Sequence, residues 1–326
     1  MHVFLTGASG FIGRNLVPYL QSRGCELTCL LRDPERLPEP LRSTVSVVVG
    51  DVTRPGTEVT RALSKADAVV HLAARLWSHT YAEYDIVNRQ GSEQLVKVTA
   101  DAAASLRRFL MVSSIAATGP ALPGKPVTES TPPAPVSWYG QTKLAGEQAL
   151  NGAPFPWTIL RPPMVYGPHD RGIRRFFTLA AKHIRPQLHW GRMELSLIHV
   201  QDVCQAIWLV LSSEDRPHSS YLINDGQPIY KVSDVLKLVA RAGNAWTVPL
   251  PLPAWLLRTV EWSLTAGQRL GWSPKGLAAD KLREVRQTAW TCDSTLMAST
   301  LGFSPEIPLS IGIPTLADWY RETGVL

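Results

Sequence analysis

The chain has 326 residues, of which 45% are hydrophobic and 18% are charged, and its formal net charge is +6. This composition is ample for a full hydrophobic core and excludes a largely disordered chain. The Lys and Arg residues are scattered rather than clustered, so we expect a small anionic ligand and no nucleic-acid partner.

Short apolar runs alternate with amphipathic stretches through the first half of the chain. Val, Leu and Phe dominate these runs, which is typical of strands buried on both faces of a parallel sheet. The predicted strands are Val3–Thr6, Glu26–Leu31, Ser46–Val49, Ala68–Leu72, Phe109–Ser113 and Trp157–Arg161. The predicted helices are Phe11–Ser22, Asn88–Leu106 and Tyr139–Leu150, and six prolines predict a loop over Gly119–Ser137. The alternation predicts an α/β fold of the Rossmann type, a doubly wound parallel sheet with helices on both faces.

The pattern changes after Pro162. We predict further helices at Arg174–His183, Val203–Leu211 and Ser233–Ala242, and a strand at Ser219–Asn224. Residues 1–165 plus about 199–230 are predicted to form the sheet domain. Residues of about 166–198 and 231–326 are predicted to form a smaller C-terminal region that closes over it.

Nothing in the sequence indicates export or a metal site. The chain opens into the apolar run Val3–Leu5 without a basic leader, and no uncharged apolar run reaches the ~18 residues of a spanning helix. Cys25 and Cys29 would lie about 13 Å apart along a strand, too far for a disulfide, so we expect reduced, packed cysteines. The histidines form no pair at metal-ligand spacing, and we predict no metal. These features predict a cytoplasmic protein.

A glycine motif lies between the first predicted strand and the first predicted helix. Gly7, Gly10 and Gly13 recur at a spacing of three. In such a turn the first glycine permits the bend, the second lets the backbone approach a pyrophosphate, and the third lets the helix pack on the strand. The helix N-terminus then offers unpaired N–H groups to phosphate oxygens. The motif predicts a dinucleotide-binding turn, with a structural glycine turn as the alternative.

The end of the second predicted strand discriminates between two dinucleotides. A carboxylate there holds the ribose 2′-hydroxyl of NAD, whereas the 2′-phosphate of NADP needs a cation. Here Leu31 takes the carboxylate's position and Arg32 follows it. Because a guanidinium binds phosphate in a bidentate manner, we expect NADP(H). Asp33 leaves NAD(H) as the alternative.

Tyr139 and Lys143 are one helical turn apart at the start of a predicted helix, so both project from one face. A neighbouring ammonium favours the phenolate form and would lower the pKa of a tyrosine, as acid–base catalysis requires. Ser113 and Ser114 follow an apolar strand and are placed to hold a substrate oxygen. The alternatives are an ordinary surface contact for the Tyr–Lys pair and a strand-end cap for the serines.

Together these motifs resemble the extended (atypical) short-chain dehydrogenase/reductase family, part of the NAD-dependent epimerase/dehydratase superfamily. The resemblance covers residues 1 to about 230. It rests on Gly7-x-x-Gly10-x-x-Gly13, His71-Leu72-Ala73-Ala74, Asn88-x-x-Gly91-Ser92, Ser114, Tyr139-x-x-x-Lys143, Arg161-Pro162-Pro163-Met164-Val165-Tyr166-Gly167-Pro168 and His199-Val200-x-Asp202-Val203. From Tyr166 onward the chain is similar to the branch of 3β-hydroxysteroid-dehydrogenase-like and dihydroflavonol-reductase-like enzymes.

The resemblance implies roles for these residues. Tyr139 would be the acid/base, Lys143 would lower its pKa and hold the nicotinamide ribose, and Ser114 would orient the substrate oxygen. The sheet domain would bind NAD(P), and the C-terminal region would bind a small-molecule substrate. With Arg32 from the strand end, the implied cofactor-binding residues are Gly7, Ser9, Gly10, Phe11, Ile12, Gly13, Arg32, Asp51, Val52, Ala73, Asn88, Tyr139, Lys143 and Pro163.

Two departures narrow the expected reaction. Ile115 and Ala116 follow Ser114 where the sugar-nucleotide dehydratases of the family carry Asp and Glu, which disfavours dehydration. Epimerases of the family usually hold NAD through the strand-end carboxylate that Leu31 replaces. We therefore expect an NADP(H)-dependent oxidoreductase that interconverts a secondary alcohol and a ketone on a largely apolar substrate. The alternatives are an NDP-sugar epimerase with tightly bound NAD and a nucleotide-sensing scaffold.

A predicted helix at residues 254–270 has an unusually wide apolar surface. Its polar side chains form a narrow stripe, and most of the remaining circumference is apolar, including two tryptophans. This pattern predicts burial in the core or at a subunit interface, a substrate pocket, or peripheral membrane contact. By analogy with the family, the helices at 88–106 and 139–150 predict a homodimer.

Overall fold

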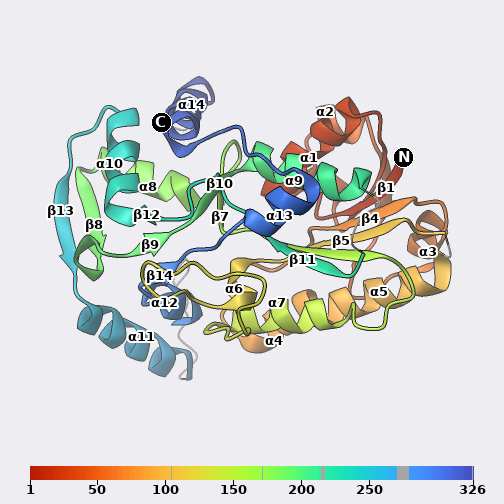
Figure 1. Ribbon diagram of the computed structural model, residues 1–326, viewed down its shortest axis with the longest axis horizontal. Helices are drawn as coiled ribbons and strands as arrows, with labels where there is room; N and C mark the ends of the chain where they lie inside the picture. The colour runs from red at the N-terminus through yellow and green to blue at the C-terminus, as the bar shows by residue number, and fades with distance from the viewer. Residues whose placement is uncertain (104, 171, 214–216, 270–278, 325) are drawn as a thin grey trace.

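The computed structural model describes the chain except residues 104, 171, 214–216, 270–278 and 325. Its centre is a parallel seven-stranded sheet in the order β11-β6-β5-β4-β1-β2-β3 (Figure 1). The strands are β1 (His2–Thr6), β2 (Glu26–Leu31), β3 (Ser46–Val49), β4 (Ala68–His71), β5 (Arg108–Val112), β6 (Trp157–Arg161) and β11 (Ser219–Leu222). The strand order reverses between β1 and β4, where a doubly wound sheet opens its binding crevice. The predicted Rossmann-type fold is confirmed.

Helices cover both faces of this sheet (Figure 1). On one face α1 (Phe11–Ser22) packs against α9 (Val200–Ser212). The other face carries α3 (Thr57–Leu63), α5 (Gly91–Ala102) and α7 (Trp138–Gln148). Two short helices, η1 (Pro34–Arg36) and α2 (Glu39–Arg42), follow β2.

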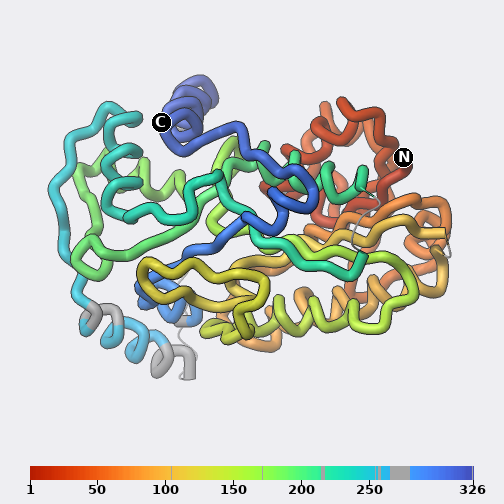
Figure 2. Tube along the Cα trace, in the orientation of Figure 1, coloured from red at the N-terminus to blue at the C-terminus, as the bar shows by residue number. Residues whose placement is uncertain are grey.

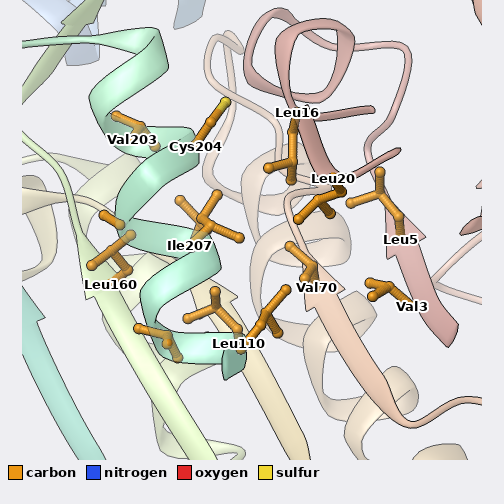
Figure 3. Close-up of a cluster of buried hydrophobic side chains, with 14 of the residues drawn as sticks. Val3, Leu5, Leu16, Leu20, Val70, Leu110, Leu160, Val203, Cys204 and Ile207 are labelled. Atoms are coloured by element: carbon orange, nitrogen blue, oxygen red, sulfur yellow. The ribbon is translucent and has the colours of Figure 1, made fainter. Parts of the chain in front are cut away.

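Alternating strand residues build a separate core on each face. Val3 and Leu5 of β1 belong to the cluster under α1 and α9, whereas Phe4 belongs to the cluster on the opposite face. Figure 3 shows Leu16 of α1 and Ile207 of α9 in the first cluster, together with Val3 and Leu5 of β1. Each fully buried side chain of this size contributes about 1.5–3 kcal/mol, which explains the continuously apolar strands.

The helix predicted at residues 88–106 begins earlier and ends earlier than expected. The structure has α4 (Tyr81–Asp85), the π-helical turn η2 (Ile86–Gln90) and then α5 without a break in the coil. Thr80 begins it, because its hydroxyl accepts a hydrogen bond from the Glu83 amide at 3.3 Å. The widened π turn shifts the apolar residues out of the 3.6-residue period on which the prediction depended.

The C-terminal region has a core of its own. There α8 (Gly172–Ala181), α10 (Val232–Ala242) and α14 (Leu309–Glu322) enclose an apolar cluster that includes Phe177 and Ile313. Its short strands form three small sheets: β7 (Met164–Tyr166) with β10 (Leu197–His199), β9 (Glu194–Leu195) between β12 (Tyr230–Lys231) and β14 (Ala289–Trp290), and β8 (Ile184–Leu188) with β13 (Val248–Leu252). The remaining elements are α6 (Ile115–Thr118), η3 (His189–Gly191), α11 (Ala254–Arg269), α12 (Ala279–Val285) and α13 (Thr295–Leu301).

All seven strands of the central sheet lie within residues 1–165 and about 199–230. The division into two domains stays a prediction. All four cysteines are buried and free. Within the described residues, no helix is both long and apolar enough to cross a bilayer.

Candidate active site

The first βα turn is shaped so closely that two of its positions require glycine. Gly7 has a φ of +76°, and a Cβ atom there would lie 2.8 Å from the Ala73 amide nitrogen. A Cβ atom on Gly13 would collide with the carbonyl oxygen of Gly7. No side chain caps α1 at Gly10, so its first N–H groups remain for an anion. The turn therefore fits a pyrophosphate.

A groove with a volume of about 280 Å³ runs from this turn to the start of α7. Most of the predicted site residues line it: Gly7, Ser9, Gly10, Phe11, Ile12, Gly13, Arg32, Asp51, Val52, Ala73, Tyr139 and Lys143. Ser114, Asn88 and Pro163 are not among its lining residues. Sequence reasoning missed Arg36, Leu76 and Val87, which do line it and which lie outside the motifs.

Cations gather at the end of the groove beyond β2. Arg32 lines the groove, and its guanidinium lies 3.8 Å from the Asp51 carboxylate. Arg36 of η1 also lines it. Leu31 is buried, and the Asp33 carboxylate accepts a hydrogen bond from the Glu35 amide at 3.1 Å, which caps η1. Asp33 is therefore used by its own turn and does not line the groove.

A buried hydrogen-bond network joins the first turn to the loop after β4. The Thr6 hydroxyl lies 2.7 Å from Nδ1 of His71 and accepts a bond from the Ala73 amide at 3.1 Å. Nε2 of His71 lies 3.0 Å from the Ser92 hydroxyl, which donates to the Asn88 carbonyl at 2.7 Å. Burial, with the nearby charge of Lys143, lowers the pKa of His71 to about 3. The neutral imidazole thus serves as a structural link.

Asn88 positions the groove wall rather than lining it. Its side-chain oxygen accepts from the Arg75 amide at 2.8 Å, and its side-chain nitrogen donates to the Arg75 carbonyl and to Thr142, each at 3.1 Å. These bonds tie the loop after β4 to α7. Pro163 is buried just after β6.

Tyr139 and Lys143 are both buried in the first turns of α7. The Lys143 ammonium donates to the Val112 carbonyl, at the end of β5, at 3.0 Å. Burial lowers the pKa of Lys143 to about 8, against the opposing effect of the Glu147 carboxylate. Glu147 is itself paired with Arg161 at 2.6 Å in the buried layer behind the site.

The resemblance implies a lowered pKa for Tyr139, but in the structure this pKa is raised. Burial raises this pKa, the Glu284 carboxylate raises it further, and the hydrogen bond with Ser114 acts to lower it. The physical reason is that the phenol lies in an apolar enclosure while the Lys143 ammonium is bound to Val112. In this state Tyr139 holds its proton.

Ser114 begins α6, where its hydroxyl accepts a hydrogen bond from the Ala116 amide at 3.1 Å. The same side chain bonds Tyr139. Ile115 and Ala116 are buried and apolar, so neither carries a proton to the site.

A segment far along the chain completes the surroundings of Tyr139. The Asp280 carboxylate of α12 accepts from the backbone amide of Trp138 at 2.6 Å and from that of Tyr139 at 3.3 Å. The Lys281 ammonium lies 4.2 Å from the centre of the Tyr139 ring, and Ser137 donates to Glu284 at 2.6 Å. These contacts span about 140 residues of sequence, and no local pattern indicated them.

This arrangement can transfer a proton to or from an oxygen atom at the end of a dinucleotide-shaped groove. Residues 3–224 match the model of the NAD-dependent epimerase/dehydratase family. The chain belongs to that family. The predicted resemblance is thereby confirmed, and the chain is an enzyme of the extended short-chain dehydrogenase/reductase type.

Known members of the family show how widely it varies. The chain is 30% identical over 334 residues to ceramide reductase of Caulobacter vibrioides, a match that covers 99% of this chain and 96% of that protein. It is 27% identical over 265 residues to a 3-beta-hydroxysteroid dehydrogenase of Mycolicibacterium neoaurum, covering 74% of this chain and 70% of that one. Among solved structures, MoeE5 in complex with UDP-glucuronic acid and NAD superposes with a TM-score of 0.79 at 25% identity, covering 99% and 100% of the two chains.

Proposed function

We propose that this enzyme is an NADP(H)-dependent oxidoreductase that interconverts a ketone and a secondary alcohol on a largely apolar substrate. The observation that supports the proposal is that Tyr139 and Lys143 line the end of the groove, with Ser114 beside Tyr139. Ile115 and Ala116 follow Ser114, so no carboxylate stands directly after it, which disfavours an elimination.

The protein's own groups account for the proton transfer. In the direction of reduction, the Tyr139 hydroxyl donates its proton to the carbonyl oxygen while the Ser114 hydroxyl donates a hydrogen bond to the same atom. The Lys143 ammonium then stabilises the phenolate. The raised pKa of Tyr139 keeps the phenol protonated and ready for this direction. The bound dinucleotide would supply the hydride, and Gly7, Gly13 and the groove along the carboxyl ends of the central strands would hold it.

The names of two relatives support an apolar substrate class. Ceramide reductase and 3-beta-hydroxysteroid dehydrogenase are both named for apolar molecules. We therefore favour a long-chain lipid ketone, of the kind whose reduction leaves the secondary hydroxyl of a ceramide.

The preference for NADP(H) is supported by the cations beyond β2. Arg32 and Arg36 line the groove, Leu31 leaves no carboxylate for a ribose hydroxyl, and Asp33 is engaged in capping η1. Each guanidinium is a bidentate partner for the 2′-phosphate. Titration of the enzyme with NADPH and NADH tests this preference, and tighter binding of NADH would contradict it.

One observation favours a second function, an NDP-sugar epimerase with tightly bound NAD. MoeE5, which shares the fold over the whole chain, is solved with UDP-glucuronic acid and NAD. The same Ser, Tyr and Lys would serve that reaction.

Cofactor behaviour separates the two functions. A reductase should exchange its dinucleotide and consume NADPH when a long-chain ketone is added, which is followed by the loss of nicotinamide absorbance. An enzyme that purifies with bound NAD, and that shows no net consumption of NADPH on any ketone offered, would instead support the epimerase.

A further inference from the structure

Large exposed apolar side chains gather at one end of the molecule, outside the groove. In Figure 1 and Figure 2 this end is the outer edge formed by β13 and α11, on the opposite side from the N-terminus. Six side chains there are between 50% and 74% exposed, four of them tryptophans. We define the tryptophan face as Trp190, Trp246, Val248, Leu250, Trp255 and Trp262.

The periodicity of β13 and of α11 directs the exposed apolar side chains of each element to one side. Val248 and Leu250 alternate along β13, so they point to one side of the strand, and Trp246, two residues before it, stacks on His183. Trp255 and Trp262 are two helical turns apart and lie on one side of α11. A single residue separates β13 from α11, and η3 packs against β13. The wide apolar surface predicted for this helix is thus exposed at both tryptophans, whereas Leu264 is buried against Leu282 of α12.

The edge of β13 disfavours a protein strand as the partner. The Val248 amide donates to the His183 carbonyl at 2.9 Å, so the alternate positions 249 and 251 face the open edge. Both positions are proline, and they offer no N–H donors to an added strand. The same lack of unpaired donors suits a surface that enters an apolar medium.

The charge around the tryptophan face complements anionic headgroups. Residues 182–193 and 241–260, which carry β8, η3, β13 and the first part of α11, contain no Asp or Glu. Their exposed cations are Lys182, Arg192, Arg241 and Arg258. Arg185 is half-buried and pairs with Pro249, so it points to the side of the strand opposite to Val248 and Leu250. Tryptophan beside basic residues is typical of segments that lie at a membrane–water interface, where each Lys or Arg near anionic lipid contributes about 1 kcal/mol.

We infer that the tryptophan face is a docking surface for a bilayer containing anionic phospholipid, on which the enzyme lies without crossing. The face is linked to the active site: Glu261 of α11 pairs with Arg283 and Arg286 of α12, and α12 holds the start of α7. An enzyme docked in this way would meet a lipid ketone at the surface where that ketone resides. The docking itself does not depend on the proposed reduction.

Vesicle flotation tests the inference on the full chain. Vesicles of phosphatidylcholine with phosphatidylglycerol should bind the enzyme, vesicles of phosphatidylcholine alone should bind it less, and added salt should weaken binding. The triple variant Trp246→Ser, Trp255→Ser and Trp262→Ser should bind the anionic vesicles at least about tenfold more weakly. The matched control Leu122→Ser with Ile311→Ser removes exposed apolar side chains elsewhere and should bind as the wild type does.

Three results would overturn the inference: no binding of the wild type to anionic vesicles at low salt, equal binding by the triple variant, or a dimer that the triple variant dissociates. NADPH titration verifies that the variants are folded. The triple variant should still reduce a detergent-dispersed ketone, because loss of docking should leave that activity in place. This assay therefore separates a failure of docking from a failure of the proposed function.

Discussion

Lys143 is buried, and burial disfavours its charged form. The side chain is buried beneath α7, its ammonium bonded to the Val112 carbonyl, and burial lowers its pKa to about 8. A lysine with this pKa is charged at neutral pH and loses its proton in the mildly alkaline range. In the proposed mechanism the ammonium is needed when the Tyr139 phenolate forms, so the rate of reduction should depend on this titration.

The pH profile of kcat/KM for NADPH in ketone reduction tests that role. This parameter reports the free enzyme, so it should be level near neutral pH and fall about tenfold per pH unit above about 8. In Lys143→Arg the residual activity should hold to higher pH, because a guanidinium stays charged. A wild-type profile that stays level well above pH 8 would contradict the role of Lys143.

At the residue scale, the sequence predicted the features that are set by the spacing of neighbouring residues. Gly7 and Gly13, and the Tyr139–Lys143 pair, lie where their spacing indicated, because a turn and a helix face are set by neighbours along the chain. The raised pKa of Tyr139 was not predictable in this way. It depends on how deeply the fold buries the ring and on Glu284, which is distant in sequence.

At the scale of elements, α12 serves as the cap of α7. The first N–H groups of a helix lack partners within it, and here Asp280 and Ser137 accept three of them: those of Trp138, Tyr139 and Gly140. Burial raises the pKa of the Asp280 carboxyl, and the two backbone bonds act to lower it. The C-terminal region thereby fixes the backbone that carries Tyr139.

Asp280→Ala should therefore slow catalysis without weakening cofactor binding. We expect a loss of about 1–2 kcal/mol in unfolding free energy from the missing cap. We expect kcat to fall by roughly 10²-fold through misplacement of Tyr139, with the dissociation constant of NADPH unchanged. Asp280→Asn, which retains one acceptor oxygen, should recover part of kcat.

Asp234→Ala is the matched control, since Asp234 is an exposed carboxylate in the first turn of α10, paired with Lys237. Chemical denaturation and steady-state kinetics measure both effects. Asp280→Ala with full kcat, or with its loss confined to KM, would show that the cap does not position the tyrosine.

Prediction of elements succeeded where burial on both faces dictates the sequence. Most strands of the central sheet are apolar runs and were found from that pattern, whereas β11 begins with two serines. The paired strands β8 and β13 were not found, because their sequences, IRPQL and VPLPL, contain proline and their pairing joins residues over 60 positions apart. The helix at α11 was predicted, but the direction of its apolar surface depends on tertiary packing.

At the scale of the whole molecule, the two regions contribute different parts of one site. The sheet and the helices that follow its strands supply the groove and the Ser, Tyr and Lys side chains, and the C-terminal region supplies α12, which holds the start of α7. The alternation of elements predicted the doubly wound parallel sheet, whereas the order of its seven strands comes from the structure. The predicted homodimer and the cytoplasmic location stay predictions.

In the proposed mechanism, Tyr139 is the acid that protonates the ketone oxygen. Single-turnover reduction of a long-chain ketone by NADPH tests it most directly, comparing the wild type with Tyr139→Phe and with Tyr221→Phe, a buried tyrosine outside the groove. We expect Tyr139→Phe to bind NADPH normally and to reduce the ketone about 10²–10⁴ times more slowly, while Tyr221→Phe retains the wild-type rate. A near-normal rate in Tyr139→Phe would contradict this mechanism.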